Sequence, residues 1–177
     1  MLSVPAPPKA ELPRWLFSLT FTLSNSHTIT VTKTCFVLRD RVQNAYVAFS
    51  LQKFVNLVSL IDEVDKSIAK LRQYDEEFSE HIIHIGGGYV IALFNGCECL
   101  NITKCYYGHL DATFQPSGVG VKLPFFAWWK LKEHIKVIYE HRDDIAAIAP
   151  CYVCVNQDDP KGLCCVHHIL KKLLVLL

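Results

Sequence analysis

The chain has little net charge and no long apolar run. Its 18 Lys and Arg residues nearly balance 17 Asp and Glu residues, so the formal net charge is +1. Such a balance provides no global field that would draw the protein onto nucleic acid or an acidic membrane. No apolar stretch approaches the roughly 20 residues that a membrane-spanning helix requires, and the Pro-rich residues 1–13 show no secretory signal pattern. We therefore expect an intracellular protein, nuclear or cytoplasmic and not secreted, with no membrane partner.

Sequence signatures of catalysis are also missing. The chain has eight His residues but no His-Glu-x-x-His motif. Gly86-Gly87-Gly88 precedes a predicted strand rather than a helix, so it does not match a phosphate-binding loop. The pair Asp143-Asp144 lies late in a predicted helix, where it is ordinary surface charge, and no nucleophile has an evident base beside it. We predict that the protein is not an enzyme.

An internal repeat is the strongest pattern that the chain contains. Two helix-like segments share a large aromatic residue that is followed by Leu three positions later and by Ile seven positions later. They are Phe54, Leu57 and Ile61 in the first segment and Trp128, Leu131 and Ile135 in the second. This spacing places the three residues on one face of a helix. Upstream, residues 31–36 parallel residues 102–107, so the repeat includes strands as well as a helix.

The repeat predicts an α+β fold of two β-β-β-β-α units, each a curved antiparallel sheet with one helix. The predicted divisions are a disordered arm at 1–11, a divergent first unit at 12–74, an acidic linker at 75–81, a second unit at 82–148 and a Cys- and His-containing tail at 149–177. A unit of about 65 residues is marginally stable alone. We therefore expect the two helices to dock against each other, which would make the chain an intramolecular pseudo-dimer.

The second unit shows the clearer strand pattern. The expected strands are 89–94, 97–107, 112–114 and 119–123. Asn95-Gly96 favours a tight hairpin, because a type I′ turn requires positive φ at both central residues, and residues 115–118 predict another turn. Pro124 suits the first turn of the helix that follows. Its buried stripe, packed against the sheet, is expected to be Trp128, Leu131, Ile135 and Ile138.

These features together resemble a known family. The matching parts are Tyr89-Val90, the hairpin, the strands at 102–107 and 118–123, and the helix Trp128-x-x-Leu131-Lys132-Glu133-x-Ile135. Their order and spacing are similar to those of the transcriptional coactivator "positive cofactor four" family, whose members are small single-stranded-DNA-binding domains. The resemblance covers nearly all of residues 82–148 and is weaker over 12–74. It implies paired four-stranded sheets that present ridges to single-stranded nucleic acid, with the helices in contact between the units.

The resemblance also implies where nucleic acid would bind. Single-strand binders combine cations along the backbone with aromatic rings on which bases stack. The candidate residues are Lys33, Phe36, Arg39, Arg41, Phe94, Lys104, Tyr106, Tyr107 and Lys122. The second unit departs from the family, because Asn95, Gly96 and Glu98 replace its basic hairpin and Pro116 and Ser117 its basic turn. Phosphate contacts dominate affinity, so one arrangement has the first unit supply charge and the second supply stacking.

Cysteine and histidine residues near the end of the sequence suggest a separate metal site. Eight Cys residues without a secretory context point to thiols that are kept reduced. Cys151 and Cys154 form a Cys-x-x-Cys pair, and Cys164 and His167 follow it after about ten residues. These four residues could supply a tetrahedral structural zinc site. The alternatives are a tail of free thiols and a disulfide formed on oxidation.

Two functional hypotheses from different classes follow. The first is a tandem-repeat protein that binds single-stranded DNA or RNA, mainly DNA, and acts with the proteins of transcription or replication; a viral protein would fit this class. The second is a protein-interaction module that keeps the fold without binding nucleic acid.

Overall fold

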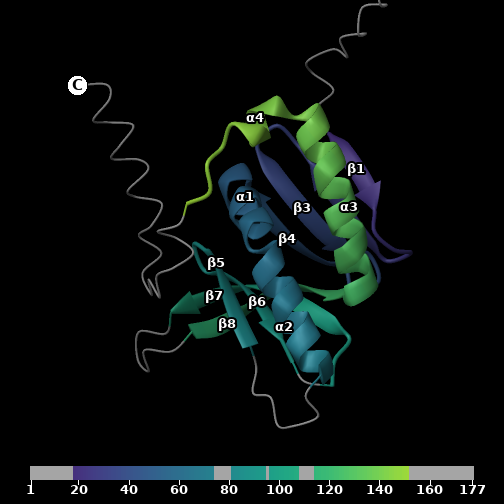
Figure 1. The fold of residues 1–177 in the computed structure, drawn as a ribbon, viewed down its shortest axis with the longest axis vertical. Helices are drawn as coiled ribbons and strands as arrows, with labels where there is room; N and C mark the ends of the chain where they lie inside the picture. Colours follow the sequence, from purple (N-terminus) through teal and green to yellow (C-terminus); the bar gives the residue numbers. More distant parts are fainter. Residues whose placement is uncertain (1–17, 74–80, 95, 108–113, 152–177) are drawn as a thin grey trace, which may run out of the picture.

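The computed structural model describes residues 18–73, 81–94, 96–107 and 114–151, which form two four-stranded antiparallel sheets with helices over them (Figure 1). The first sheet contains β1 (Leu19–Thr22), β2 (His27–Val31), β3 (Cys35–Asp40) and β4 (Ala45–Ser50). The second contains β5 (His81–Gly86), β6 (Tyr89–Leu93), β7 (Cys99–Tyr107) and β8 (Phe114–Pro124). In each sheet the strands lie in sequence order. The predicted α+β fold, with two antiparallel sheets each followed by a helix, is confirmed.

The first sheet forms because apolar and polar residues alternate along its strands, which gives one buried face and one solvated face. The inward residues, each at most 1% exposed, are Ile29, Val31, Phe36, Leu38, Val47 and Phe49. The residues between them are mostly Thr, Arg and small side chains, and they face outward. The chemistry of this outward face is therefore polar and basic.

The second sheet differs from its prediction in two places. Its first strand is β5, which pairs with β6 through a turn at Gly87 and Gly88 (φ +60° and +80°). Its last strand is one long strand, β8, where two strands and a turn at 115–118 were predicted; residues 112 and 113 lie outside the described residues. Pairing continues through that turn because a bulge accommodates the extra residues. Thr103 pairs with Gly120 and Cys105 with Pro116, which leaves residues 117–119 opposite Lys104.

The connection between β6 and β7 follows the predicted hairpin only in part. Gly96 has a φ of +74°, and the amide of Cys97 donates to the carbonyl of Phe94 at 3.3 Å, as in a tight turn. However, strand pairing ends at Leu93 and Leu100. The loop is therefore longer than the two-residue connection that Asn95-Gly96 predicted, and Asn95 itself lies outside the described residues.

The helical part of the first unit is divided in two. The prediction of a single helix is wrong, since α1 (Leu51–Ser59) ends at Leu60 and α2 (Ile61–Gln73) follows directly. Ser50 caps α1 by accepting a hydrogen bond from the amide of Lys53 at 3.4 Å. At the break, the amide of Leu60 donates to the carbonyls of Leu57 and Val58, which tightens the last turn of α1.

The second unit ends in α3 (Phe125–His141) and the short α4 (Asp143–Ala146). The predicted apolar stripe is confirmed, since Trp128, Leu131 and Ile138 are fully buried and Ile135 is 7% exposed. Its location differs from the prediction, however, because α3 lies over the first sheet instead of its own (Figure 1). The rings of Phe21 on β1 and His134 on α3 stack with centroids 4.6 Å apart.

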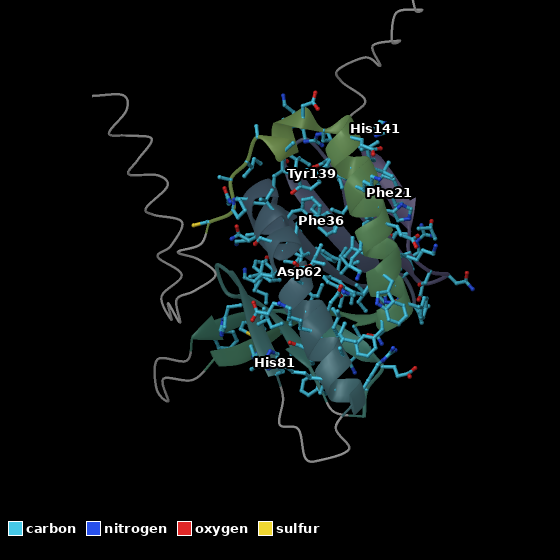
Figure 2. The ribbon with its side chains drawn as sticks, in the orientation of Figure 1. Phe21, Phe36, Asp62, His81, Tyr139 and His141 are labelled. Atoms are coloured by element: carbon cyan, nitrogen blue, oxygen red, sulfur yellow. The ribbon has the colours of Figure 1, made fainter. Side chains whose placement is uncertain are left out.

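Two helices, α2 and α3, are thus exchanged between the two units, whereas α1 packs on its own sheet through Phe54 and Phe36. While α3 covers the first sheet, α2 lies over the second (Figure 1). Phe36 and Tyr139, labelled in Figure 2, lie between the first sheet and the helices, where each ring neighbours Phe54 of α1. Buried residues of both sheets and of α1, α2, α3 and α4 form one hydrophobic cluster. The exchange of α2 and α3 and the shared core together imply that the two units fold cooperatively.

None of the helices in the described part is long and apolar enough to cross a membrane.

Asn56 of α1 joins three segments that are distant in the sequence. Its side-chain amide donates to the carbonyl of Ile85 in β5 at 3.1 Å, and its side-chain oxygen accepts from the amide of Cys151 at 2.9 Å. The residue is 1% exposed, and buried backbone groups that lose their partners are costly.

We expect Asn56→Ala to lower the free energy of unfolding by about 2–4 kcal/mol, because it strands one buried carbonyl and one buried amide. Urea denaturation followed by circular dichroism measures the change. Gln52→Ala is the comparison, since it removes one bond to the Asn56 side-chain oxygen (3.3 Å) and one to the exposed Ala149 carbonyl (2.8 Å) but leaves no buried backbone group without a partner, so it should cost about 1 kcal/mol or less. Equal stability of the two variants would contradict the role assigned to Asn56.

Candidate nucleic-acid interface

The outward face of the first sheet carries a groove of about 330 Å³. It is lined by Thr20, Thr28, Thr30, Val37, Arg39 and Arg41. The floor is formed by threonines on the paired strands β1 and β2, where the hydroxyls of Thr20 and Thr30 lie 3.1 Å apart. Thr28 is paired across β2 and β3 with Arg39. The groove therefore places hydroxyl groups beside two guanidinium groups.

Two arginines give this groove its charge. Arg39 and Arg41 are exposed, and neither guanidinium forms a hydrogen bond or ion pair with another residue of the described ranges. Asp40, the acid between them in sequence, is 4% exposed because alternation turns it to the other face. Its carboxylate accepts hydrogen bonds from the amides of Val42 (2.9 Å) and Gln43 (3.2 Å) in the following turn. The two positive charges are thus left available for an anion.

An exposed tyrosine borders the groove. Tyr46 at the start of β4 pairs with Arg39 and is 54% exposed. The guanidinium carbon of Arg39 lies 6.0 Å from the centre of the Tyr46 ring. Tyr46 was absent from the sequence prediction, although its outward position follows from the alternation with Val47 and Phe49. An exposed ring beside a cation is the combination on which nucleobases stack.

The two sheets meet along a seam between β8 and the strands β3 and β4. His27 of β2 forms a hydrogen bond across this seam: its Nε2–H donates to the carbonyl of Lys122 on β8 at 2.8 Å. The Nδ1 atom of the same ring lies 2.9 Å from the hydroxyls of Ser24 and Ser26. His27 pairs with Asp40 across β2 and β3, and both side chains are buried on the face of the sheet opposite the groove. The Lys122 side chain is exposed but does not line the groove.

Two predicted residues of the first unit do not belong to this groove. Phe36 cannot stack on a base, so that prediction is wrong: it faces inward, is fully buried and packs against Phe49 and Phe54. Lys33 is exposed, but it lies in the turn before β3, whereas Arg41 follows the end of that strand. The six residues of β3 separate the two turns by about 20 Å.

The predicted residues of the second unit fall at two ends of its sheet. Phe94 follows β6 at the end where Leu93 pairs with Leu100, and it is 38% exposed. Lys104 and Tyr106 lie towards the other end of β7, and Tyr106 is 52% exposed. The Tyr107 side chain is outside the described residues. The structure therefore does not bring the predicted aromatic residues of this unit together.

A second basic and aromatic cluster, which the sequence prediction missed in part, surrounds Tyr89. The Nζ atom of Lys53 on α1 lies 4.6 Å from the centre of the Tyr89 ring, and that of Lys104 lies 6.0 Å away. The hydroxyl of Tyr89 donates to the carbonyl of Ala48 on β4 at 3.0 Å. Burial raises the pKa of this hydroxyl, so it stays a neutral donor. The cluster adjoins β4, whose first residues border the arginine groove.

The zinc prediction falls largely outside the described residues. Of the four proposed ligands, Cys154, Cys164 and His167 lie there, and Cys151 is 8% exposed beside α1. Within ranges 18–73, 81–94, 96–107 and 114–151, no three His, Cys, Asp or Glu side chains are grouped as a metal site requires. Structural zinc therefore stays a prediction from the spacing in the sequence.

Comparison of the chain with protein-family models, with curated proteins and with solved structures gives no match. The resemblance to the positive cofactor four family accordingly stays a prediction.

Proposed function

We propose that this chain is a single-stranded nucleic-acid-binding protein, mainly for DNA, that acts in transcription or replication. The observation that carries the proposal is the groove on the first sheet. There Arg39 and Arg41 have no anionic partner among the described residues, and Tyr46 exposes its ring beside them. Guanidinium groups bind phosphate with two parallel hydrogen bonds, while the ring accepts a base.

Single strands suit this surface better than duplexes. A duplex hides the faces of its bases, so an aromatic ring such as Tyr46 gains little from it, whereas unpaired bases can stack at about 1–3 kcal/mol each. Duplex binding depends on many phosphate contacts, and the net charge of this chain is only +1. A few well-placed cations combined with stacking match the single-stranded ligand.

A second set of cations and a ring could hold the strand beyond the groove. Lys53, Tyr89 and Lys104 lie near the far end of β4, whose six residues span about 20 Å, and the Tyr89 ring packs there against Phe49. Cations and rings therefore occur at both ends of β4. In this arrangement the first unit supplies most of the charge, and the second unit adds Lys104, Lys122 and the ring of Tyr89.

The paired units belong to the same proposal. Both sheets have the same strand order, and each is covered by helix from the other unit. Contacts such as the hydrogen bond from Trp128 Nε1 to Asp65 (2.9 Å) join the helices directly. These features support an intramolecular pseudo-dimer, in which one polypeptide supplies the two sheets that the proposed function uses.

Fluorescence anisotropy with a labelled oligo(dT) tests the function. We expect a dissociation constant in the micromolar range or tighter at low salt, with weaker binding to a duplex of the same length. Because few phosphates are contacted, the dependence of log K on log salt should be shallow, about −0.7 per phosphate. If no single-stranded oligonucleotide binds at low salt, the alternative of a protein-interaction module is favoured.

A substitution at Tyr46 tests the contribution of base stacking to binding. Tyr46→Ala removes an exposed ring and should weaken oligo(dT) binding at least about fivefold. Its salt dependence should stay unchanged, since no charge is lost. Tyr46→Phe keeps the ring and should bind as the wild type does. Equal binding by all three proteins would show that Tyr46 does not contact bases.

A further inference from the structure

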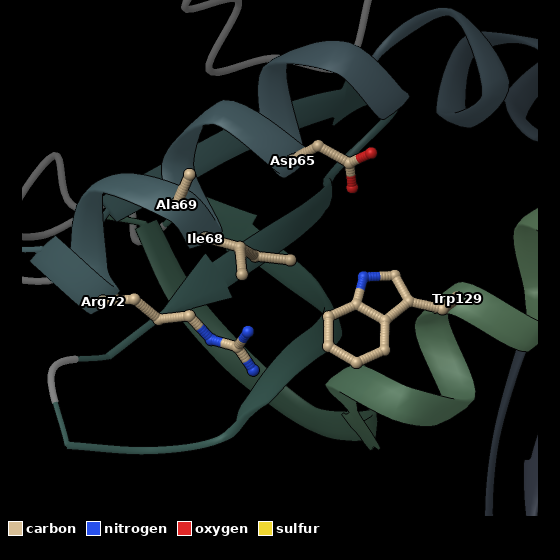
Figure 3. A pocket seen from close by; sticks show the side chains of 5 residues that line it. All are labelled: Asp65, Ile68, Ala69, Arg72 and Trp129. Atoms are coloured by element: carbon tan, nitrogen blue, oxygen red, sulfur yellow. The ribbon is translucent and has the colours of Figure 1, made fainter.

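A second hollow lies between α2 and α3, on the helical side of the molecule. It has a volume of about 410 Å³ and is lined by Asp65, Ile68, Ala69, Arg72 and Trp129. Figure 3 shows the guanidinium of Arg72 and the indole of Trp129 projecting into the same space from the two helices. The volume lies within the range of pockets that bind ligands or partner side chains. The proposed nucleic-acid function makes no use of this hollow.

The charges in the hollow do not balance. Asp65 is already satisfied, because one carboxylate oxygen accepts from Trp128 Nε1 at 2.9 Å and the other lies 2.5 Å from Lys132 Nζ. The Arg72 guanidinium has no hydrogen bond or ion pair within the described residues. Its carbon lies 5.2 Å from the centre of the Trp129 ring and 5.5 Å from that of Phe125. One positive charge is thus held over two rings, and no acceptor among the described residues takes its N–H groups.

Apolar surface adjoins this charge. Trp129 is 39% exposed and Phe126, three residues earlier on α3, is 55% exposed. Residues three apart lie on the same side of a helix, so Phe126 extends the apolar surface beyond the hollow. On the α2 side, Ile68 and Ala69 add to the apolar lining of the hollow. Trp and Arg are the residue types that most often dominate the binding energy of protein interfaces.

We propose that this hollow binds an acidic peptide segment of a partner protein, in which a large apolar side chain neighbours a carboxylate. The carboxylate would pair with Arg72 through two parallel hydrogen bonds. The apolar side chain would pack on Trp129 and Ile68, with the next apolar group on Phe126. Charge complementarity selects the acidic partner, because Asp65 and Lys132 neutralise each other and no anion of ranges 18–73, 81–94, 96–107 and 114–151 pairs with Arg72.

The test uses the full chain and a short fluorescein-labelled peptide in which Phe alternates with Asp and Glu. We expect Arg72→Gln to weaken peptide binding at least about tenfold, the loss of a charge-assisted pair. Arg72→Lys keeps the charge without the planar fork, so an intermediate loss is expected. Lys70→Gln is the matched control, because Lys70 is exposed on the same helix and lies outside the hollow.

Two further comparisons separate this site from the groove on the first sheet. A peptide with Asn and Gln in place of its acids, and a second with Ala in place of Phe, should each bind at least about tenfold more weakly. Oligo(dT) binding should be unaffected by Arg72→Gln. The proposal is overturned if the wild type does not bind the acidic peptide, if Arg72→Gln and Lys70→Gln bind it equally, or if Arg72→Gln weakens oligo(dT) binding instead.

Discussion

Reversing both charges in the groove of the first sheet should remove oligonucleotide binding. For the double variant Arg39→Glu and Arg41→Glu we expect affinity for oligo(dT) to fall at least about 100-fold at low salt. A hydrogen bond to a charged group contributes about 1.5–3 kcal/mol, and a factor of ten in affinity corresponds to about 1.4 kcal/mol. Each replacement also adds a negative charge that repels phosphate. Fluorescence anisotropy at several salt concentrations measures both the affinity and its slope.

The salt dependence of binding shows whether the lost contacts are contacts to phosphate. Loss of two phosphate contacts should reduce the dependence of log K on log salt by about 1.4. The control is the double variant Lys66→Glu and Lys70→Glu, which changes net charge equally on the exposed side of α2. Both variants should unfold within a few degrees of the wild type, because the four side chains are exposed and none has an ion-pair partner among the described residues. If both variants lose affinity equally, binding follows overall charge and the groove is not the site.

Trp128→Ala should unfold the two units together. Trp128 is the largest fully buried side chain of the described residues, and its Nε1 donates to Asp65 of α2. Removing a buried Trp costs about 3–5 kcal/mol. Because buried residues of both sheets form one cluster, the loss should shift a single transition in urea instead of releasing one half. Circular dichroism and intrinsic fluorescence should report the same midpoint.

Two other variants of α3 serve as comparisons for the loss of stability in Trp128→Ala. Phe126→Ala removes an exposed ring and should change stability by less than about 1 kcal/mol. Trp128→Phe keeps an aromatic ring at the site but loses the hydrogen bond to Asp65 and part of the packing, so a cost of about 2–3 kcal/mol, below that of Trp128→Ala, is expected. Two separate unfolding transitions in Trp128→Ala, or a folded fragment containing residues 82–148 alone, would contradict the pseudo-dimer.

Local periodicity predicted the parts of the fold that depend on it. The spacing of Trp128, Leu131 and Ile135 identified the buried face of α3, because a helical period places those side chains together. Alternation identified the strands in the same way. It could also have excluded Phe36 from the site, since Phe36 shares its face with Leu38 and not with Arg39. The resemblance and the alternation disagree at Phe36, and the alternation agrees with its burial.

Turn residues were less reliable guides. Pro116 and Gly118 predicted a turn, but they lie in β8, where a bulge takes up the extra residues. Gly86 to Gly88 were recognised as preceding a strand, whereas their role as the turn that pairs β5 with β6 was missed. Both motifs are compatible with a turn or with a bulge, and only pairing with a neighbouring strand selects between them.

The sequence by itself determined the α+β class of the fold, the buried face of α3 and the polar, basic character of the first sheet's outward face. Those properties follow from residues a few positions apart, because the periods of a helix and of a strand fix which of them share a face whatever the rest of the fold. Only the tertiary structure decided that α2 and α3 are exchanged, that Tyr89 and Lys53 meet beside β4, and that Arg72 lies over Trp129. Hydrophobic burial is not directional, so an apolar helix face does not specify which sheet it will cover. Contacts between residues dozens of positions apart make that choice.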